Sequence, residues 1–311
     1  MSLFDRDEDG NLSFSPKKKD CLFQFVKEKK LSTLLLSSEF FFKQTEILKT
    51  HFPGAIFIAY LRFPLEVIES SYNQGVKRHG ETRKLGVPIK PKSIQLNLLE
   101  SIIKTVGKEN FILRPFENEC FVGNSLINDF KDVLNLPLES FPKDIDSKKV
   151  NTSYSLDALE FKRWFNQFPL GNLQAALDNF LQAYSINKPS FSLIRPNIFV
   201  QYKSDYINLM ERFCSEYNVH NSQHFLRCCR QISQRNIVRQ NISNQEFELL
   251  LQQFLKFDSK IPSLLYTQIS NEWNLYANIK EPERLKIIKQ HISPVIKCST
   301  IVRKFLFKWL K

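Results

Sequence analysis

Three short apolar runs stand out in the first half of the chain, at residues 31–36, 55–62 and 111–114. The second run is Ala-Ile-Phe-Ile-Ala-Tyr-Leu-Arg, and its branched and aromatic residues are typical of a strand that is buried on both faces. Stretches with helical periodicity separate the three runs. The pattern therefore predicts an α/β fold in which the three strands are neighbours in one mainly parallel sheet flanked by helices.

A helix is predicted directly after the second strand. Pro64 suits the first helical position, where a missing N–H costs nothing, and Leu65, Ile68 and Tyr72 then share one face. Arg62 thus lies where the strand meets the N-terminus of a helix, a place that favours anions. Ser70, eight residues later, adds a hydroxyl from the second turn. The alternative is that Arg62 only pairs with a neighbouring carboxylate or carbonyl.

From residue 151 onward the pattern is almost entirely helical. Ala158, Phe161, Phe165 and Phe168 fall on one helical face, and Ser243 with Glu246 forms a capping box. We therefore predict three regions along the chain. They are a polar N-terminal segment at residues 1–30, an α/β core at 31–150 and a mainly helical region at 151–311.

The net charge of +12 and the isoelectric point near 9.3 indicate an anionic partner. Nucleic acid is not expected, because the sequence holds no zinc-finger or RNP motif. Residues 294–311 place apolar side chains among lysines and arginines, so two roles are predicted for this last helix: packing on the core, or contact with an anionic membrane surface. The sequence contains neither a signal-peptide pattern nor a run of 18 apolar residues.

The six cysteines show no Cys-x-x-Cys spacing and no paired histidine ligands. Neither a metal site nor a disulfide framework is therefore expected. Adjacent Cys228 and Cys229 are awkward partners for each other, and reduced thiols indicate a cytoplasmic compartment.

The segments Arg62-Phe63-Pro64 and Ser70-Ser71-Tyr72 resemble the 3′-phosphate-binding element of bacterial carbohydrate-type sulfotransferases that use 3′-phosphoadenosine 5′-phosphosulfate (PAPS). The resemblance implies a P-loop-NTPase-like sheet, PAPS as the nucleotide donor and the hydroxyl of a carbohydrate or small molecule as the acceptor. It also implies that Arg62 and Ser70 hold the 3′-phosphate. Phe116, where the family usually has tyrosine, would then stack on adenine, since stacking survives that change, with a place in the apolar core as the alternative.

Two further sets of residues are assigned from this resemblance. The run from Thr33 to Glu39 resembles the strand and turn that carry the general base of the family, so Glu39 is the candidate base, with a place in the first turn of a helix as the alternative. Lys77, Arg78 and His79 follow directly from the nucleotide site and are candidates to meet an anionic nucleotide or acceptor. Their alternative role is to complement the dipole at the C-terminus of their helix.

The sequence departs from the family in one respect. No Gly-x-x-x-x-Gly-Lys-type or Pro-Lys-x-Gly-Thr-type loop, which would hold the 5′-phosphosulfate, lies before Leu31. We therefore expect either a chain that lacks the N-terminal part of such an enzyme or one that binds nucleotide without catalysis. The rival hypothesis is a noncatalytic basic scaffold that binds a polyanion or a partner protein.

Overall fold

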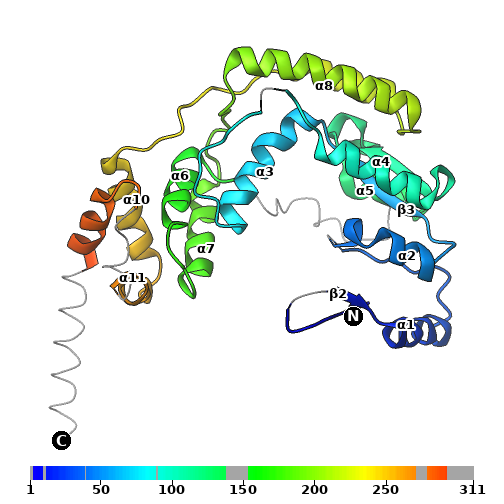
Figure 1. Ribbon diagram of the computed structural model, residues 1–311, viewed down its shortest axis with the longest axis horizontal. Helices are drawn as coiled ribbons and strands as arrows, with labels where there is room; N and C mark the ends of the chain where they lie inside the picture. Colours follow the sequence, from blue (N-terminus) through cyan, green and yellow to red (C-terminus); the bar gives the residue numbers. More distant parts are fainter. Residues whose placement is uncertain are drawn as a thin grey trace, which may run out of the picture. The chain divides into compact units, whose positions relative to one another are not determined.

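The computed structural model describes residues 3–9, 12–38, 40–88, 90–137, 153–270 and 279–292 (Figure 1). The chain divides into two compact units, each assembled from separate stretches of sequence. Unit 1 comprises Met1–Leu61, Ser93–Arg114 and Phe213–His220, and unit 2 comprises Arg62–Lys92, Pro115–Arg212 and Asn221–Lys311. The three regions predicted from the sequence stay a prediction.

A small parallel sheet is formed by β3 (Phe57–Leu61) and β4 (Phe111–Pro115). Leu113 of β4 also makes a parallel bridge to Val219, and the N–H of His220 donates to the carbonyl oxygen of Leu113 at 2.9 Å. The helices α2 (Thr45–His51) and α4 (Ile94–Val106) pack against each other within unit 1. The prediction that these two strands are neighbours in a parallel sheet is confirmed.

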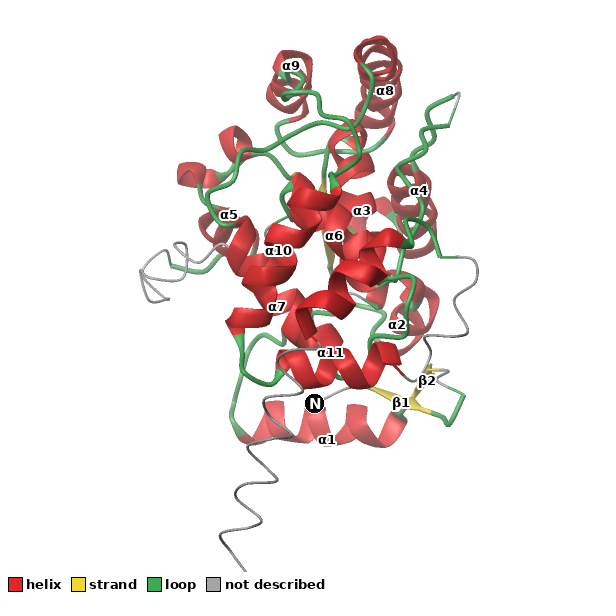
Figure 2. Ribbon diagram, turned by 90° about the vertical axis from the view of Figure 1, so that its left-hand side faces the viewer, coloured by secondary structure: helices red, strands yellow, loops and turns green. Residues whose placement is uncertain are grey.

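The strand predicted at residues 31–36 is wrong, because the structure assigns no strand to residues 31–38. Leu31 and Leu35 are about half exposed, at 49% and 51%, so the run lacks the burial on both faces that its composition indicated. Within the described residues the parallel sheet therefore has two strands. The molecule is an α/β protein that is mostly helical, as the red ribbons of Figure 2 show.

The first residues of unit 1 form a hairpin followed by a helix. Strands β1 (Phe4–Arg6) and β2 (Leu12–Phe14) pair antiparallel, with Phe4 opposite Phe14 and their rings packed edge to face at 5.7 Å. Helix α1 (Pro16–Glu28) begins at a proline, as the rule for first helical positions leads one to expect. Leu3, Phe4 and Leu48 are the buried centre of this small apolar cluster.

Unit 2 contains most of the helices. Their bounds are α3 (Pro64–Arg78), α5 (Leu126–Val133), α6 (Leu156–Phe165), α7 (Leu173–Ser185), α8 (Pro196–Glu216, whose last turn belongs to unit 1), α9 (Ser222–Gln231), α10 (Asn244–Phe257), α11 (Ile261–Ser270) and a helical stretch at 283–292. Short 3-10 turns are η1 (Phe41–Lys43), η2 (Lys108–Asn110), η3 (Asn118–Cys120) and η4 (Val122–Asn124).

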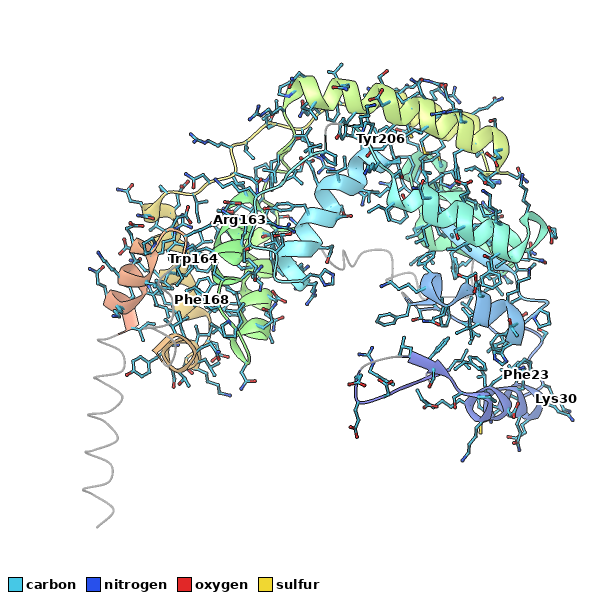
Figure 3. The ribbon with its side chains drawn as sticks, viewed as in Figure 1. Phe23, Lys30, Arg163, Trp164, Phe168 and Tyr206 are labelled. Atoms are coloured by element: carbon cyan, nitrogen blue, oxygen red, sulfur yellow. The ribbon has the colours of Figure 1, made fainter. Side chains whose placement is uncertain are left out.

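The core of unit 2 is aromatic and centres on α6. Phe161 lies 4.8 Å from Phe247 of α10, measured between ring centroids, and Trp164 lies 5.2 Å from Phe168 (Figure 3). All four side chains are at most 5% exposed. The predicted apolar face of α6 and the predicted capping box of Ser243 and Glu246 at the start of α10 are both confirmed.

Candidate functional site

Arg62 and Ser70 lie together at the start of α3. Pro64 takes the first helical position, which begins the helix two residues after Arg62. Nη1 of Arg62 donates a long hydrogen bond to Oγ of Ser70 at 3.5 Å, and Nε lies 3.6 Å from Oε2 of Glu66. The arginine side chain is 32% exposed. Both contacts are long, so the guanidinium keeps donors for an incoming anion.

Phe116 lies beside this pair. The guanidinium carbon of Arg62 is 5.8 Å from the centroid of the Phe116 ring, and the same ring packs edge to face against Phe121 at 5.7 Å. Phe116 is 39% exposed. An aromatic face held next to a cation is a suitable platform for a planar base attached to a phosphate.

A cavity of about 760 Å³ opens next to Arg62 and Ser70 within unit 2. Its walls come from α3, from the segment with Ser153 and Ser155, and from the end of α7 with the loop after it. Lys188 and Arg235 also line the cavity. The volume falls within the range of pockets that hold small molecules and cofactors.

Hydrogen bonds fix the wall of the cavity to α3. Asn73 donates from Nδ2 to the carbonyl oxygen of Tyr154 at 3.4 Å and accepts from the Tyr154 N–H at 3.2 Å. The N–H of Ser155 donates to Oγ of Ser185 at 3.0 Å. These buried contacts join segments that are far apart in the sequence, so the hydroxyl-rich wall faces the helix that carries Ser70.

The charges around the cavity have both signs. Oε1 of Glu69 accepts from Oγ of Ser192 at 3.0 Å and from the N–H of Leu193, which stabilises its negative charge inside the wall. Lys188 lies 3.6 Å from Asp157 and donates to the Tyr184 hydroxyl at 3.2 Å, and this hydrogen bond raises the pKa of the lysine. Lys188 is therefore positively charged at neutral pH.

The three residues predicted to meet an acceptor lie at the other end of α3. Lys77 is fully buried, with Nζ 5.3 Å from the centroid of the Tyr154 ring, and burial lowers its pKa. Nη1 of Arg78 pairs with Oδ2 of Asp178 at 3.1 Å, whereas His79 is exposed. Ligands in solvent therefore reach Arg78 and His79 but not the ammonium of Lys77 in this structure, and the acceptor-binding role stays a prediction.

Two other sequence predictions lie outside the described residues. Glu39, the candidate base, is one of them, and the predicted last helix at residues 294–311 is the other. Within the described part of the chain, no helix combines the length and the apolar character needed to cross a membrane.

A buried polar network next to the cavity was not anticipated from the sequence. Asp178 accepts from the Tyr154 hydroxyl at 2.9 Å and lies 4.0 Å from Nζ of Lys162. Lys162 is 1% exposed and donates to Asn166 at 2.9 Å and to Gln174 at 2.7 Å. One signal was present, because Lys162 follows Ala158 by four residues and thus interrupts the apolar face of α6.

Lys162 should make stability depend on pH. Burial lowers its pKa from 10.5 to about 8, so the unfolded chain binds this proton more tightly than the folded chain does. The free energy of unfolding should therefore rise as the pH increases from about 8 toward 10.5, and it should gain nothing from Lys162 below that window. Urea denaturation across this range would measure the rise, and Lys162→Met should lack it. Parallel curves for the two proteins would contradict the prediction.

Comparisons with protein-family models, curated proteins and solved structures gave no match for this chain. An assignment of function therefore depends on the geometry of the site alone.

Proposed function

We propose that the chain is a sulfotransferase-type protein that binds PAPS. Transfer of the sulfuryl group to a hydroxyl acceptor, most simply a carbohydrate, also requires groups that hold the 5′-phosphosulfate, and the sequence predicts none of these. The observation that carries this proposal is the cluster of Arg62, Ser70 and Phe116 beside the 760 Å³ cavity. A cation and a hydroxyl can donate hydrogen bonds to the 3′-phosphate of such a nucleotide, and an aromatic face can stack on its adenine. The proposal includes the P-loop-NTPase-like arrangement of the sheet that the family resemblance implies.

Each residue has a distinct role in the proposed complex. Arg62 and Ser70 donate hydrogen bonds to the 3′-phosphate, and the N-terminus of α3 adds the positive end of a 15-residue helix. The ring of Phe116 stacks on adenine. The acceptor oxygen attacks sulfur, the bond between sulfur and the 5′-phosphate oxygen breaks, and adenosine 3′,5′-bisphosphate leaves. The family resemblance assigns the proton of the acceptor hydroxyl to Glu39 as the general base.

Titration calorimetry with adenosine 3′,5′-bisphosphate and with 5′-AMP isolates the 3′-phosphate. A charge-assisted hydrogen bond contributes about 1.5–3 kcal/mol, so the bisphosphate should bind about 10- to 100-fold more tightly than 5′-AMP. The variant Arg62→Ala should abolish this preference. Equal affinities for the two ligands, or a preference that survives in Arg62→Ala, would show that Arg62 is structural.

Two further variants sharpen the experiment. Glu66 lies 3.6 Å from Nε of Arg62, so Glu66→Gln removes a charge that repels phosphate and should tighten bisphosphate binding several-fold. Arg83 is the matched control, because it is 81% exposed and pairs with Glu81 instead of lining the cavity. Arg83→Ala should leave both affinities unchanged. Tight and selective binding without turnover on any hydroxyl acceptor would favour the noncatalytic scaffold.

A further inference from the structure

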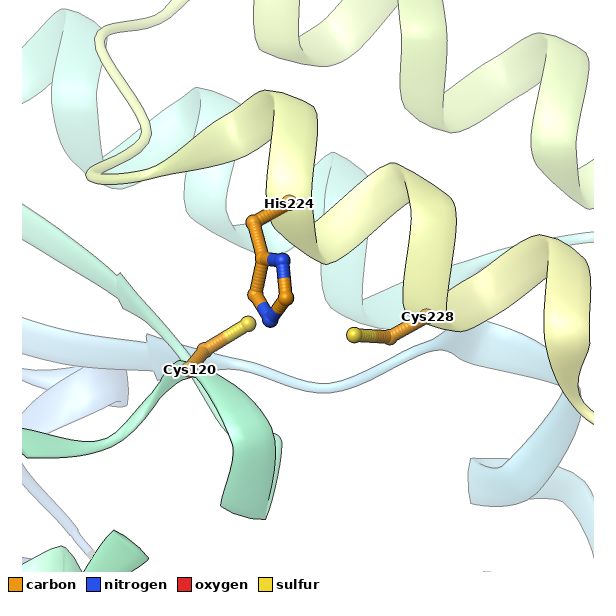
Figure 4. Close-up of side chains that lie close together, drawn as sticks. All are labelled: Cys120, His224 and Cys228. Carbon is orange, nitrogen blue, oxygen red and sulfur yellow. The ribbon is translucent and has the colours of Figure 1, made fainter. Parts of the chain in front are cut away.

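Three potential metal ligands meet in unit 2 outside the cavity. Cys120 ends the 3-10 turn η3, and α9 carries His224 and Cys228 one helical turn apart. The ligand atoms of the three side chains all lie within 4.8 Å of one another. Figure 4 shows the imidazole and both sulfur atoms turned toward the same space. Cys120 and Cys228 are only 7% and 6% exposed, so the two sulfur atoms are shielded from solvent, whereas His224 is partly buried.

A fourth donor stands next to Cys228. Oε2 of Glu119 accepts from the Cys228 thiol with a distance of 3.7 Å to Sγ. In a tetrahedral zinc site with Zn–S bonds of about 2.3 Å and Zn–O bonds of about 2.1 Å, sulfur and oxygen ligands are about 3.6 Å apart. Glu119 therefore lies at the separation from Cys228 that such a site requires. Cys120, His224 and Cys228 need to approach one another by about 1 Å, and the Glu119 carboxylate, which lies outside that group of three, must turn toward Cys120 and His224 to complete the site.

We propose that Cys120, His224 and Cys228, with Glu119 as the fourth ligand, bind a zinc ion. Two thiolates and an imidazole exclude the hard cations magnesium and calcium, which prefer oxygen ligands. A carboxylate in the set favours zinc over monovalent copper, which prefers purely soft ligands. The sequence pattern did not indicate this site, because its ligands do not follow Cys-x-x-Cys spacing and Cys120 lies far along the chain from α9.

Arg227 controls which nitrogen of His224 is available. Its Nη2 lies 3.0 Å from Nδ1 of His224, and a guanidinium can only donate, so Nδ1 accepts and Nε2 is left for the metal. When Nε2 binds zinc, the ring proton moves to Nδ1 and Arg227 must release it. The arginine is exposed and can turn into solvent. Removing Arg227 should therefore strengthen zinc binding.

The test is a zinc titration of the full chain, kept reduced with a phosphine and freed of metal beforehand. One equivalent of zinc should bind, and cobalt in its place should give thiolate-to-metal charge-transfer bands with the visible spectrum of a tetrahedral ion. Loss of a group that hydrogen-bonds to a metal ligand costs about 10- to 100-fold in affinity. Loss of a ligand itself should cost more, so Cys120→Ser, His224→Asn and Cys228→Ser should each weaken zinc binding by more than a hundredfold. Glu119→Gln should lose about tenfold, and Arg227→Ala should bind more tightly than the wild type.

The controls are Cys21→Ser and Cys214→Ser, whose thiols lie outside the cluster and should leave affinity unchanged. Circular dichroism checks that each variant is folded. The cobalt spectrum of the wild-type chain shows whether thiolates coordinate the metal, and this result does not depend on the variants. A wild-type chain without thiolate-to-cobalt bands would overturn the proposal. Weaker zinc binding by Arg227→Ala would overturn the assignment of Nε2 as the ligand.

Discussion

Replacing Asp178 with alanine should lower the free energy of unfolding by about 3–5 kcal/mol, because removing one partner of a buried ion pair leaves the other charge uncompensated. Asp178 is 4% exposed, and its carboxylate accepts from Tyr154 and pairs with Arg78. Arg78 is 46% exposed and can turn into solvent, but Lys162 is 1% exposed and cannot. Chemical denaturation of the wild type and of Asp178→Ala measures the difference.

A second variant separates the charge from the shape of the side chain. The double substitution Asp178→Asn with Lys162→Met removes both buried charges and keeps an acceptor for the Tyr154 hydroxyl, so it should recover most of the lost stability. The network joins α3, α6 and α7, and α3 and α7 each form part of the wall of the cavity. A loss below about 1 kcal/mol for Asp178→Ala would mean that the network is already solvated.

The second large effect is expected in the aromatic core. Phe247 is fully buried and contacts the rings of Phe161, Trp164 and Phe165 at centroid distances of 4.8, 5.0 and 6.1 Å. Phe247→Ala should therefore cost about 3–5 kcal/mol, as deletion of a buried aromatic ring generally does. Thermal or urea denaturation gives the value.

Leu249 provides the matched control on the same helix. It lies two residues beyond Phe247 in α10 and is 57% exposed, so Leu249→Ala should change stability by less than about 0.5 kcal/mol. Similar losses for the two variants would show that α10 does not pack on α6 as the structure has it.

The sequence predicts the local structure well wherever one rule determines it. Pro64 starts α3, the capping box at Ser243 starts α10, and the periodic aromatic residues of α6 form the core, because each feature depends on neighbours in the sequence. The run at residues 31–36 shows the limit of such rules. Its composition suits a strand, but a strand also needs a partner, and pairing depends on distant segments.

The candidate site shows the same contrast between features set by neighbours in the sequence and features set by distant segments. Arg62 and Ser70 could be paired from the sequence because the strand end and the helix fix their distance, and Phe116 directly follows a strand that the pattern also indicated. Ser153, Lys188 and Arg235 could not be assigned to the cavity, since only the folding of unit 2 brings them there. The ligands of the proposed zinc site were missed for the same reason, because η3 and α9 meet only in the folded chain.

The most direct test of the proposed function is a crystal structure of the chain with adenosine 3′,5′-bisphosphate. The 3′-phosphate should lie within about 3 Å of the guanidinium of Arg62 and of the hydroxyl of Ser70, with the adenine against the ring of Phe116. A bisphosphate bound elsewhere on the chain, with the Arg62 guanidinium still held by Glu66 and Ser70 alone, would contradict the proposal.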